Sequence, residues 1–217
     1  MSELVGIEGG SLGTEGGEVV VAVETRTGKG PWTYEELSRR TPEDHVRREI
    51  IDGWLYIDGQ PVDDPMAVVV SDSATTTHQY VVLELAASLR DYRADHAGYV
   101  GLSPLDVALG DHTVQPDVFW VPTDERLDRP VRVTPSFVVE VSSPSTRRHD
   151  LVRKRRVYEQ AGVAEYWFID LDANRIERYS LGSDGSYRSP DLVPVGKVIV
   201  STALAGFEVA VEDLLSY

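Results

Sequence analysis

An apolar run at residues 137–141 encloses a single acid, Glu140. The run is rich in β-branched and aromatic residues, and Pro135 and Pro144 bound it on its two sides. A short run of this kind predicts a strand that is covered on both faces. An unpaired carboxylate is strongly disfavoured in such a place. Glu140 is therefore expected to be protonated, paired with a cation or bound to a metal.

A second apolar run, residues 118–121, begins directly after Asp117 and also predicts a strand. If the two strands pair side by side, the carboxylates of Asp117 and Glu140 point at one place. Two acidic oxygens at one place suit a hard divalent cation such as Mg²⁺. The alternative is that Glu140 is held in a buried ion pair with a nearby arginine.

The basic segment that follows predicts a helix over residues 150–161. At about 100° per residue, its apolar side chains fall on one arc, with Lys154 near the middle and Asp150 beside it. The neighbouring arginines point elsewhere. We therefore interpret Lys154 as an ammonium placed toward the interior, and the alternative is a lysine whose stem covers the core while its charged end reaches water.

The rest of the chain alternates between helical and strand patterns. Asp52-Gly53 predicts a tight turn between two strands, and His78 lies on the buried face of a predicted helix, in its first turn. The expected helices are 34–40, with Thr33 as its N-cap, a helix that Thr76 or Thr77 caps and that runs to about residue 92, 150–161 and 212–215. The expected strands are 46–51, 54–57, 100–102, 105–109, 114–121, 137–141, 165–169, 175–181 and 206–211. This order predicts a mixed α/β domain.

Composition limits the remaining possibilities. The 217 residues, of which 41% are hydrophobic, suffice for one core, so we expect a flexible glycine-rich arm at residues 1–30 and one domain at 31–217. No run approaches the roughly 20 apolar residues that span a bilayer, and no signal segment is present, which predicts a cytosolic protein. The absence of cysteine excludes disulfides and thiolate chemistry, and the histidine spacing argues against a zinc site.

The formal net charge of −15 argues against a surface built to grip duplex DNA. The balance reverses beside the predicted site, where Arg147, Arg148 and Arg153 lie among further basic residues. These three arginines are candidates for binding a phosphate-bearing segment. The alternative is a solvated helix face.

Several motifs in this order resemble the Uma-two family of putative restriction endonucleases, which belongs to the PD-(D/E)xK nuclease superfamily. The resemblance spans residues 32–215 and rests on Pro116-Asp117, Glu140, Ser143-Pro144-Ser145, Asp150 with Lys154, and Gly162-Val163-Ala164-Glu165-Tyr166-Trp167. In most of the superfamily the lysine follows the acid by two residues, where this chain has Ser142. In this branch it is thought to lie on the following helix, which Lys154 matches.

The resemblance implies a restriction endonuclease-like core and a metal-dependent endonuclease acting on nucleic acid, most of all DNA. Asp117 and Glu140 would hold Mg²⁺ or Mn²⁺, with the carbonyl of Val141 as a further ligand. Lys154 would help to deprotonate the attacking water or neutralise the pentacoordinate phosphate.

The resemblance also makes Glu49 and His78 secondary site candidates. The alternatives from the residues alone are an acid at a strand edge that faces water, and a histidine that is packed in the core.

Two other functions stay open. A catalytically idle binding or regulatory protein with the same fold is favoured by the acidic charge and by the displaced lysine. An enzyme that acts on RNA or on a small phosphodiester is a further alternative. A small body with one basic segment would contact two strands most simply as a two-fold homodimer.

Overall fold

The computed structural model describes residues 30–42, 44, 46–69, 75–123, 125 and 127–216. The predicted N-terminal arm therefore lies outside the described residues, apart from Gly30. The described residues form two larger sheets, a two-stranded sheet and several helices, so the predicted mixed α/β class is confirmed.

The central sheet has six strands within the described residues. In order across the sheet they are β11 Asp191–Pro194, β10 Arg175–Ser180, β9 Glu165–Asp170, β8 Phe137–Val141, β7 Val118–Val121 and β4 Tyr99–Leu102. Strands β8 and β9 are parallel, and the other neighbouring pairs are antiparallel. Because parallel neighbours need a crossover, the chain between them forms the helices η1 His149–Lys154 and α3 Arg155–Gln160.

A second, antiparallel sheet carries the N-terminal part of the described chain. Its order is β3 Gln60–Val62, β2 Trp54–Ile57, β1 Arg48–Ile51, β6 His112–Val114 and β5 Val107–Leu109, and β12 Val198–Val200 pairs separately with β13 Glu208–Ala210. The predicted Asp52-Gly53 turn joins β1 to β2, with φ values of 53° and 73° that suit a tight hairpin.

The strand prediction was incomplete in two ways. Strands β3, β11 and β12 were not predicted, because each is short and only partly buried and so lacks a clear apolar pattern. The single strand predicted at 114–121 is two strands, β6 and β7, in different sheets. Pro116 lies at the break, where it has no N–H group to continue a ladder.

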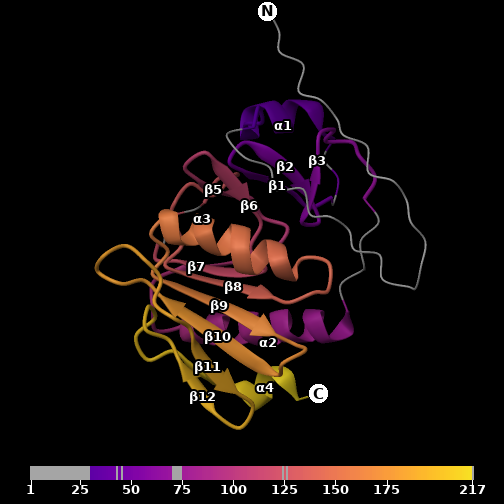
Figure 1. Cartoon of the computed structure of the whole chain (residues 1–217). Coiled ribbons are helices and arrows are strands. Elements are labelled where there is room, and N and C mark those ends of the chain that lie inside the picture. The colour runs from indigo at the N-terminus through magenta and orange to yellow at the C-terminus, as the bar shows by residue number, and fades with distance from the viewer. Residues whose placement is uncertain are drawn as a thin grey trace, which may run out of the picture.

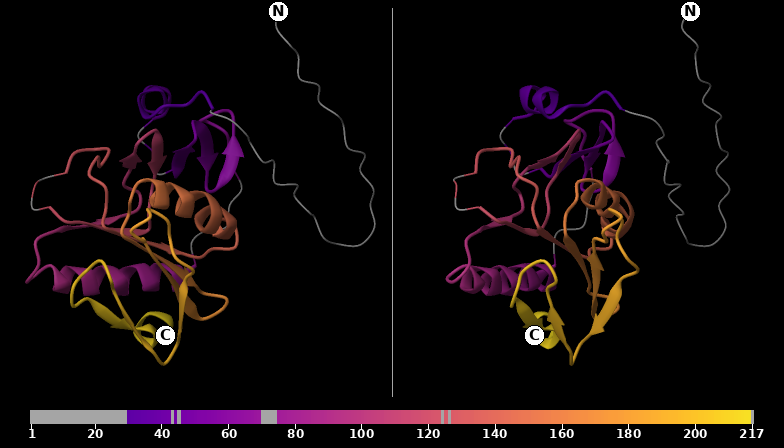
Figure 2. Two further views of the ribbon diagram at one scale, coloured as in Figure 1. Left: turned by 60° about the vertical axis from the view of Figure 1, so that its left-hand side comes forward. Right: turned by 90° about the vertical axis from the view of Figure 1, so that its left-hand side faces the viewer.

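The helices cover the two faces of the central sheet. Helix α2, Thr76–Tyr92, and α4, Val211–Leu215, lie on one side of the central sheet (Figures 1 and 2). Helix α3 and the five-stranded sheet lie on the other side, and α1, Tyr34–Arg40, lies at the far end of the five-stranded sheet. The predicted N-cap Thr33 is confirmed for α1. Thr75 caps α2 in place of Thr76 or Thr77.

Alternation along β7 and β8 decides which face carries the functional groups. Val118 and Val139 belong to the core that includes α2, whereas Phe119 and Val138 belong to the core on the α3 side. Since side chains alternate between faces, Glu140 shares the side of Val138. The residue just before β7, Asp117, shares the side of Phe119 by the same rule.

The segment Glu165-Tyr166-Trp167 has a structural role. The fully buried carboxylate of Glu165 accepts hydrogen bonds from Trp167 Nε1, from Ser201 Oγ at 3.1 Å and from Ala203 N at 2.7 Å. Thr202 donates to the same carboxylate from its hydroxyl at 2.6 Å. This one acid therefore fixes strand β9 to the segment that precedes β13.

Candidate active site

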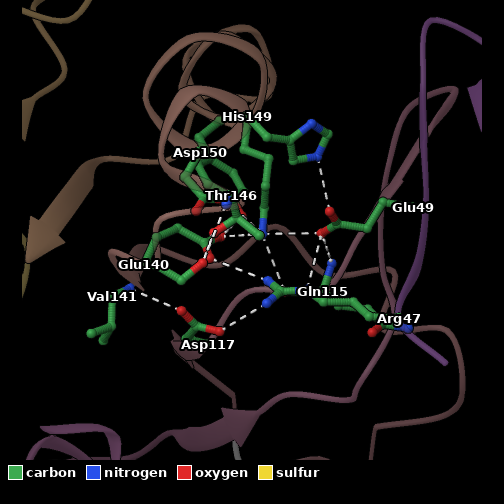
Figure 3. Close-up of polar contacts among 12 residues, drawn as sticks. Arg47, Glu49, Gln115, Asp117, Glu140, Val141, Thr146, His149 and Asp150 are labelled. Carbon is green, nitrogen blue, oxygen red and sulfur yellow. Dashed lines mark hydrogen bonds and ion pairs between the residues drawn. The ribbon is translucent and has the colours of Figure 1, made fainter. Parts of the chain in front are cut away.

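Asp117 and Glu140 lie side by side on neighbouring strands, as the sequence predicted. Val118 is opposite Val139 in the antiparallel β7–β8 pair, so one further step along the ladder places Asp117 opposite Glu140. Both residues are buried, with 3% and 0% of their surface exposed. Figure 3 shows both carboxylates directed toward the guanidinium of Arg47.

Three donors surround the carboxylate of Asp117. Its Oδ2 accepts a hydrogen bond from the N–H of Val141 at 2.9 Å and lies 3.4 Å from His78 Nε2. Its Oδ1 accepts from Arg47 Nη1 at 3.1 Å. Burial alone raises the pKa of Asp117, but Arg47 and His78 together hold that pKa well below its ordinary value. Asp117 is therefore ionised, and the side chain of His78 is brought into the site.

The helix that carries Lys154 begins with a π-helical segment, η1, and the α-helix predicted from residue 150 is wrong over these residues. The N–H of Arg155 donates to the carbonyl of Asp150, five residues earlier. Because a π turn stacks residues five apart, His149 and Lys154 come to share one face. His149, Asp150 and Lys154 are all buried there.

The ammonium of Lys154 is fully buried among acids. Its Nζ lies 2.5 Å from Glu140 Oε1, 3.0 Å from Glu49 Oε1 and 3.7 Å from an oxygen of Asp150. The alternative of a lysine that reaches water is therefore wrong. Burial and Arg47 lower the pKa of Lys154, but the carboxylates outweigh them and raise it above its ordinary value. Lys154 is a permanent cation in this environment.

Glu49 joins the same cluster from β1. Its Oε1 accepts from the N–H of Gln115 at 2.8 Å, and its Oε2 lies 2.9 Å from His149 Nε2. The alternative that Glu49 faces water is wrong, since only 2% of it is exposed. Although burial opposes ionisation, Lys154 and Arg47 hold the pKa of Glu49 well below its ordinary value.

Arg47 and His149 were not identified from the sequence. Arg47 connects the acids: its Nη2 lies 3.3 Å from Glu140 Oε2 and donates to the carbonyl of Gln115, in addition to the contact with Asp117. The alternative of a buried ion pair between Glu140 and an arginine is therefore confirmed. The available signal was the spacing Arg47-x-Glu49, which places both side chains on one side of an extended segment.

Burial disfavours the ionisation of Glu140. Burial raises its pKa to about 8, which exceeds the lowering by Lys154, and the carboxylates of Asp150 and Asp117 add to the increase. Tyr158 donates its hydroxyl to Oε1 of Glu140 at 2.5 Å. The acids Glu49, Asp117, Glu140 and Asp150 face two permanent cations, Arg47 and Lys154. Because burial raises the pKa of both Glu140 and Asp150, the metal-free cluster favours the neutral form of these two acids.

The donor chemistry fits a hard divalent cation, which prefers carboxylate oxygens. Within the described ranges, however, no group of three or more histidine, cysteine, aspartate and glutamate side chains is already arranged to hold a metal ion. The reason at Asp117 and Glu140 is visible in Figure 3, where Arg47 bridges the two carboxylates. The carboxylate oxygens suit a hard divalent cation by their chemistry, and the guanidinium of Arg47 lies between them.

The three arginines predicted to bind substrate lie outside this cluster. Arg147 donates to Asp170 at 2.7 Å, Arg153 lies over the ring of Tyr56 at 5.2 Å, and Arg148 is exposed. Arg153 therefore lies on η1, and Arg147 and Arg148 lie directly before it, with all three side chains away from the buried acids of the cluster. Their proposed contact with phosphate stays a prediction.

We expect the free energy of unfolding of the metal-free protein to fall as the pH rises from about 5 to about 8. The raised pKa of Glu140, about 8 against an ordinary value of 4.5, means that the native protein keeps a proton that the unfolded chain has lost in this window. One such proton lowers the free energy of unfolding by up to about 1.4 kcal/mol per pH unit. Urea unfolding in EDTA at several pH values measures this slope.

The matched variant is Glu140→Gln, which cannot titrate at this position and should show a smaller slope. Part of the slope should remain, because burial also raises the pKa of Asp150. Asp117 and Glu49 have lowered pKa values, so they stabilise the native protein above the ordinary pKa of an acid. This stabilisation is lost only when acid protonates them, which is outside the window from about pH 5 to about pH 8. Equal slopes in wild type and Glu140→Gln would contradict the assignment to Glu140.

Comparison with known proteins gives a family and a fold. The family model described as Uma2, putative restriction endonuclease, matches residues 33–212. A crystal structure of a putative nuclease belonging to DUF820 from Anabaena variabilis is similar with a TM-score of 0.65 and 16% sequence identity, covering 86% of this chain and 98% of that chain. The curated proteins contain no match. None of the helices in the described part of the chain has the length and apolar character that crossing a membrane requires.

Proposed function

We propose that this chain, which belongs to the Uma2 family of putative restriction endonucleases, hydrolyses phosphodiester bonds of nucleic acid with the help of a divalent cation. The observation that carries the proposal is the pairing of two buried carboxylates, Asp117 and Glu140, with the ammonium of Lys154 at 2.5 Å from the second. Two adjacent acids and a cation are the groups that metal-assisted phosphodiester hydrolysis requires.

Asp117 and Glu140 are the proposed ligands of Mg²⁺ or Mn²⁺, and the carbonyl of Val141 is proposed as a further ligand. A bound cation of this kind polarises a phosphoryl oxygen and lowers the pKa of a bound water. The protein fixes the orientation of the first acid through the N–H of Val141 and that of the second through the hydroxyl of Tyr158. Both contacts support the proposal because a ligand set must be held in place before it binds.

Lys154 is proposed to stabilise negative charge on the phosphate. The sequence left two roles for this residue, and its raised pKa favours one of them. A lysine that keeps its proton cannot accept a proton from water, but it can neutralise charge that develops in the transition state. Glu49 supports this role by holding the ammonium from its other side at 3.0 Å.

His78 and Glu49 are proposed as secondary site residues. His78 contacts the ligand Asp117, and Glu49 contacts both Lys154 and His149. Each therefore acts through another group, as a positioning residue. The exposed Arg148, with Arg147 and Arg153, is proposed to contact the phosphate backbone of the nucleic acid. DNA is the proposed nucleic acid. A two-fold homodimer and a cytosolic location stay predictions.

A second candidate function is a catalytically idle binding or regulatory protein with this fold. One observation favours it: the charged groups of the cluster already satisfy one another, because Arg47 bridges both acids and Lys154 pairs with Glu140. A cluster of this kind is also able to serve as a structural ion-pair network.

A cleavage assay separates the two candidates. Purified protein is incubated with single-stranded DNA, duplex DNA and RNA in Mg²⁺, in Mn²⁺ and in EDTA. The proposed enzyme cuts at least one of these substrates with either metal and cuts none in EDTA. No cleavage of any substrate, together with retained binding of nucleic acid, would support the idle protein instead.

A further inference from the structure

Arg47 stands between the two proposed metal ligands. Its Nη1 donates to Asp117 Oδ1 at 3.1 Å, and its Nη2 lies 3.3 Å from Glu140 Oε2. The guanidinium and the two carboxylates face one another in Figure 3. A planar cation that joins two carboxylates occupies the position from which a metal ion would contact both. Arg47 and a metal ion therefore compete for these oxygens.

Arg47 is also the most exposed of the charged side chains in this cluster. Its side chain is 19% exposed, whereas His78 is 10% exposed and the acids are at most 4% exposed. Lys154 is fully buried. An ion that enters from solvent therefore meets Arg47 before it meets the carboxylates.

The contacts of Arg47 allow it to leave more readily than Lys154 can. Its Nε is buried but has no hydrogen-bond partner among the described residues. The guanidinium is thus held by Asp117, Glu140 and the carbonyl of Gln115, with Glu49 Oε1 at 3.9 Å from Nε, and it is attached just before β1. Lys154, in contrast, is enclosed on η1 with no exposed surface. The exposed arginine is therefore the cation that a metal ion can replace.

We propose that Arg47 is a resident counter-ion, which holds Asp117 and Glu140 together until a divalent cation displaces it. This inference rests on the proposed function, because it takes these two acids as the metal ligands. In the absence of metal, Arg47 donates to Asp117 Oδ1 and contacts Glu140 Oε2, so it holds both acids in place. In the presence of metal it competes, and so it sets the cation concentration at which the site assembles.

The test measures Mn²⁺ binding without nucleic acid, from the electron paramagnetic resonance signal of free Mn²⁺. Arg47→Met keeps an unbranched apolar stem and removes the competing charge, so its Kd for Mn²⁺ should be at least about ten-fold lower than that of wild type. The matched control is Arg48→Met, at the next residue of the chain, which is the first residue of β1. The guanidinium of Arg48 pairs with Asp44 and with the carbonyl of Pro65, away from the two ligands. The Kd of Arg48→Met for Mn²⁺ should equal that of wild type.

Two further variants separate failure of this inference from failure of the proposed function. Asp117→Asn and Glu140→Gln should lose Mn²⁺ binding if these acids are the ligands. If they lose it while Arg47→Met binds Mn²⁺ as wild type does, or more weakly, the counter-ion role is overturned and the metal site stands. If both bind Mn²⁺ as wild type does, the metal site itself is overturned.

Thermal unfolding keeps the test decisive if Arg47→Met is unstable. Removing the guanidinium leaves the buried carboxylate of Asp117 without its main cation, so the metal-free variant should melt below wild type. Mn²⁺ should then raise its Tm by more than it raises that of wild type. Arg47→Lys, whose point charge does not bridge both acids in the same way, should show a smaller change in the same direction. An increase in Tm no larger than that of wild type in both variants would contradict the proposal.

Discussion

Glu140→Gln is expected to lower the single-turnover rate of Mn²⁺-dependent cleavage by about 10³-fold or more. Glutamine has the shape of the acid but cannot supply the negative charge of a metal ligand. The fold should persist, because glutamine has nearly the volume of the acid and because burial, which raises the pKa of Glu140 to about 8, favours a neutral group at this position. A quenched-flow or gel assay at saturating protein measures the rate, and circular dichroism measures the fold.

Glu177→Gln is the matched control for this experiment. Glu177 is also a buried glutamate of the central sheet, but it lies on β10 and contacts Arg175 and Tyr179. Its loss should change stability without changing the cleavage rate. Cleavage by folded Glu140→Gln at the wild-type rate would remove Glu140 from the active site.

Lys154→Met is expected to lower the single-turnover rate by about 10²- to 10⁴-fold, whereas Arg155→Met should leave it nearly unchanged. The two residues are adjacent, but Lys154 contacts Glu140 and Glu49, while Arg155 lies over the ring of Tyr179 at 5.2 Å. Methionine preserves the buried stem of either residue and removes only the charge. Rates measured at saturating protein separate a loss of catalysis from a loss of substrate binding.

Stability is measured in parallel, because Lys154→Met leaves the acids around it without one of their two permanent cations. Breaking a buried ion pair in this way destabilises a protein by about 3–5 kcal/mol. The rate must therefore be compared at a temperature where the variant is folded, as judged from its own unfolding curve. Equal rates for Lys154→Met and Arg155→Met under that condition would assign Lys154 to structure and not to catalysis.

The strands and helices that carry the proposed site were largely predictable. Strand β8, the Asp52-Gly53 turn and helix α2 all lie close to their predicted ranges. Each depends on local signals, namely an apolar run, a turn dipeptide and helical periodicity, which neighbouring residues encode together. The short outer strands β3, β11 and β12 were missed because partial burial produces a weak pattern.

The sequence by itself therefore predicted a buried Glu140, a strand that begins directly after Asp117 and an inward Lys154, and it left open whether the two strands pair. Only the tertiary structure decided which groups neutralise these acids. Arg47 meets Glu140 across 93 positions of sequence separation, and Glu49 meets His149 across 100. No local pattern specifies such partners, because a buried charge can be compensated by any cation that packing brings within a few ångströms. These partners come together because the five-stranded sheet packs near η1 and the central sheet.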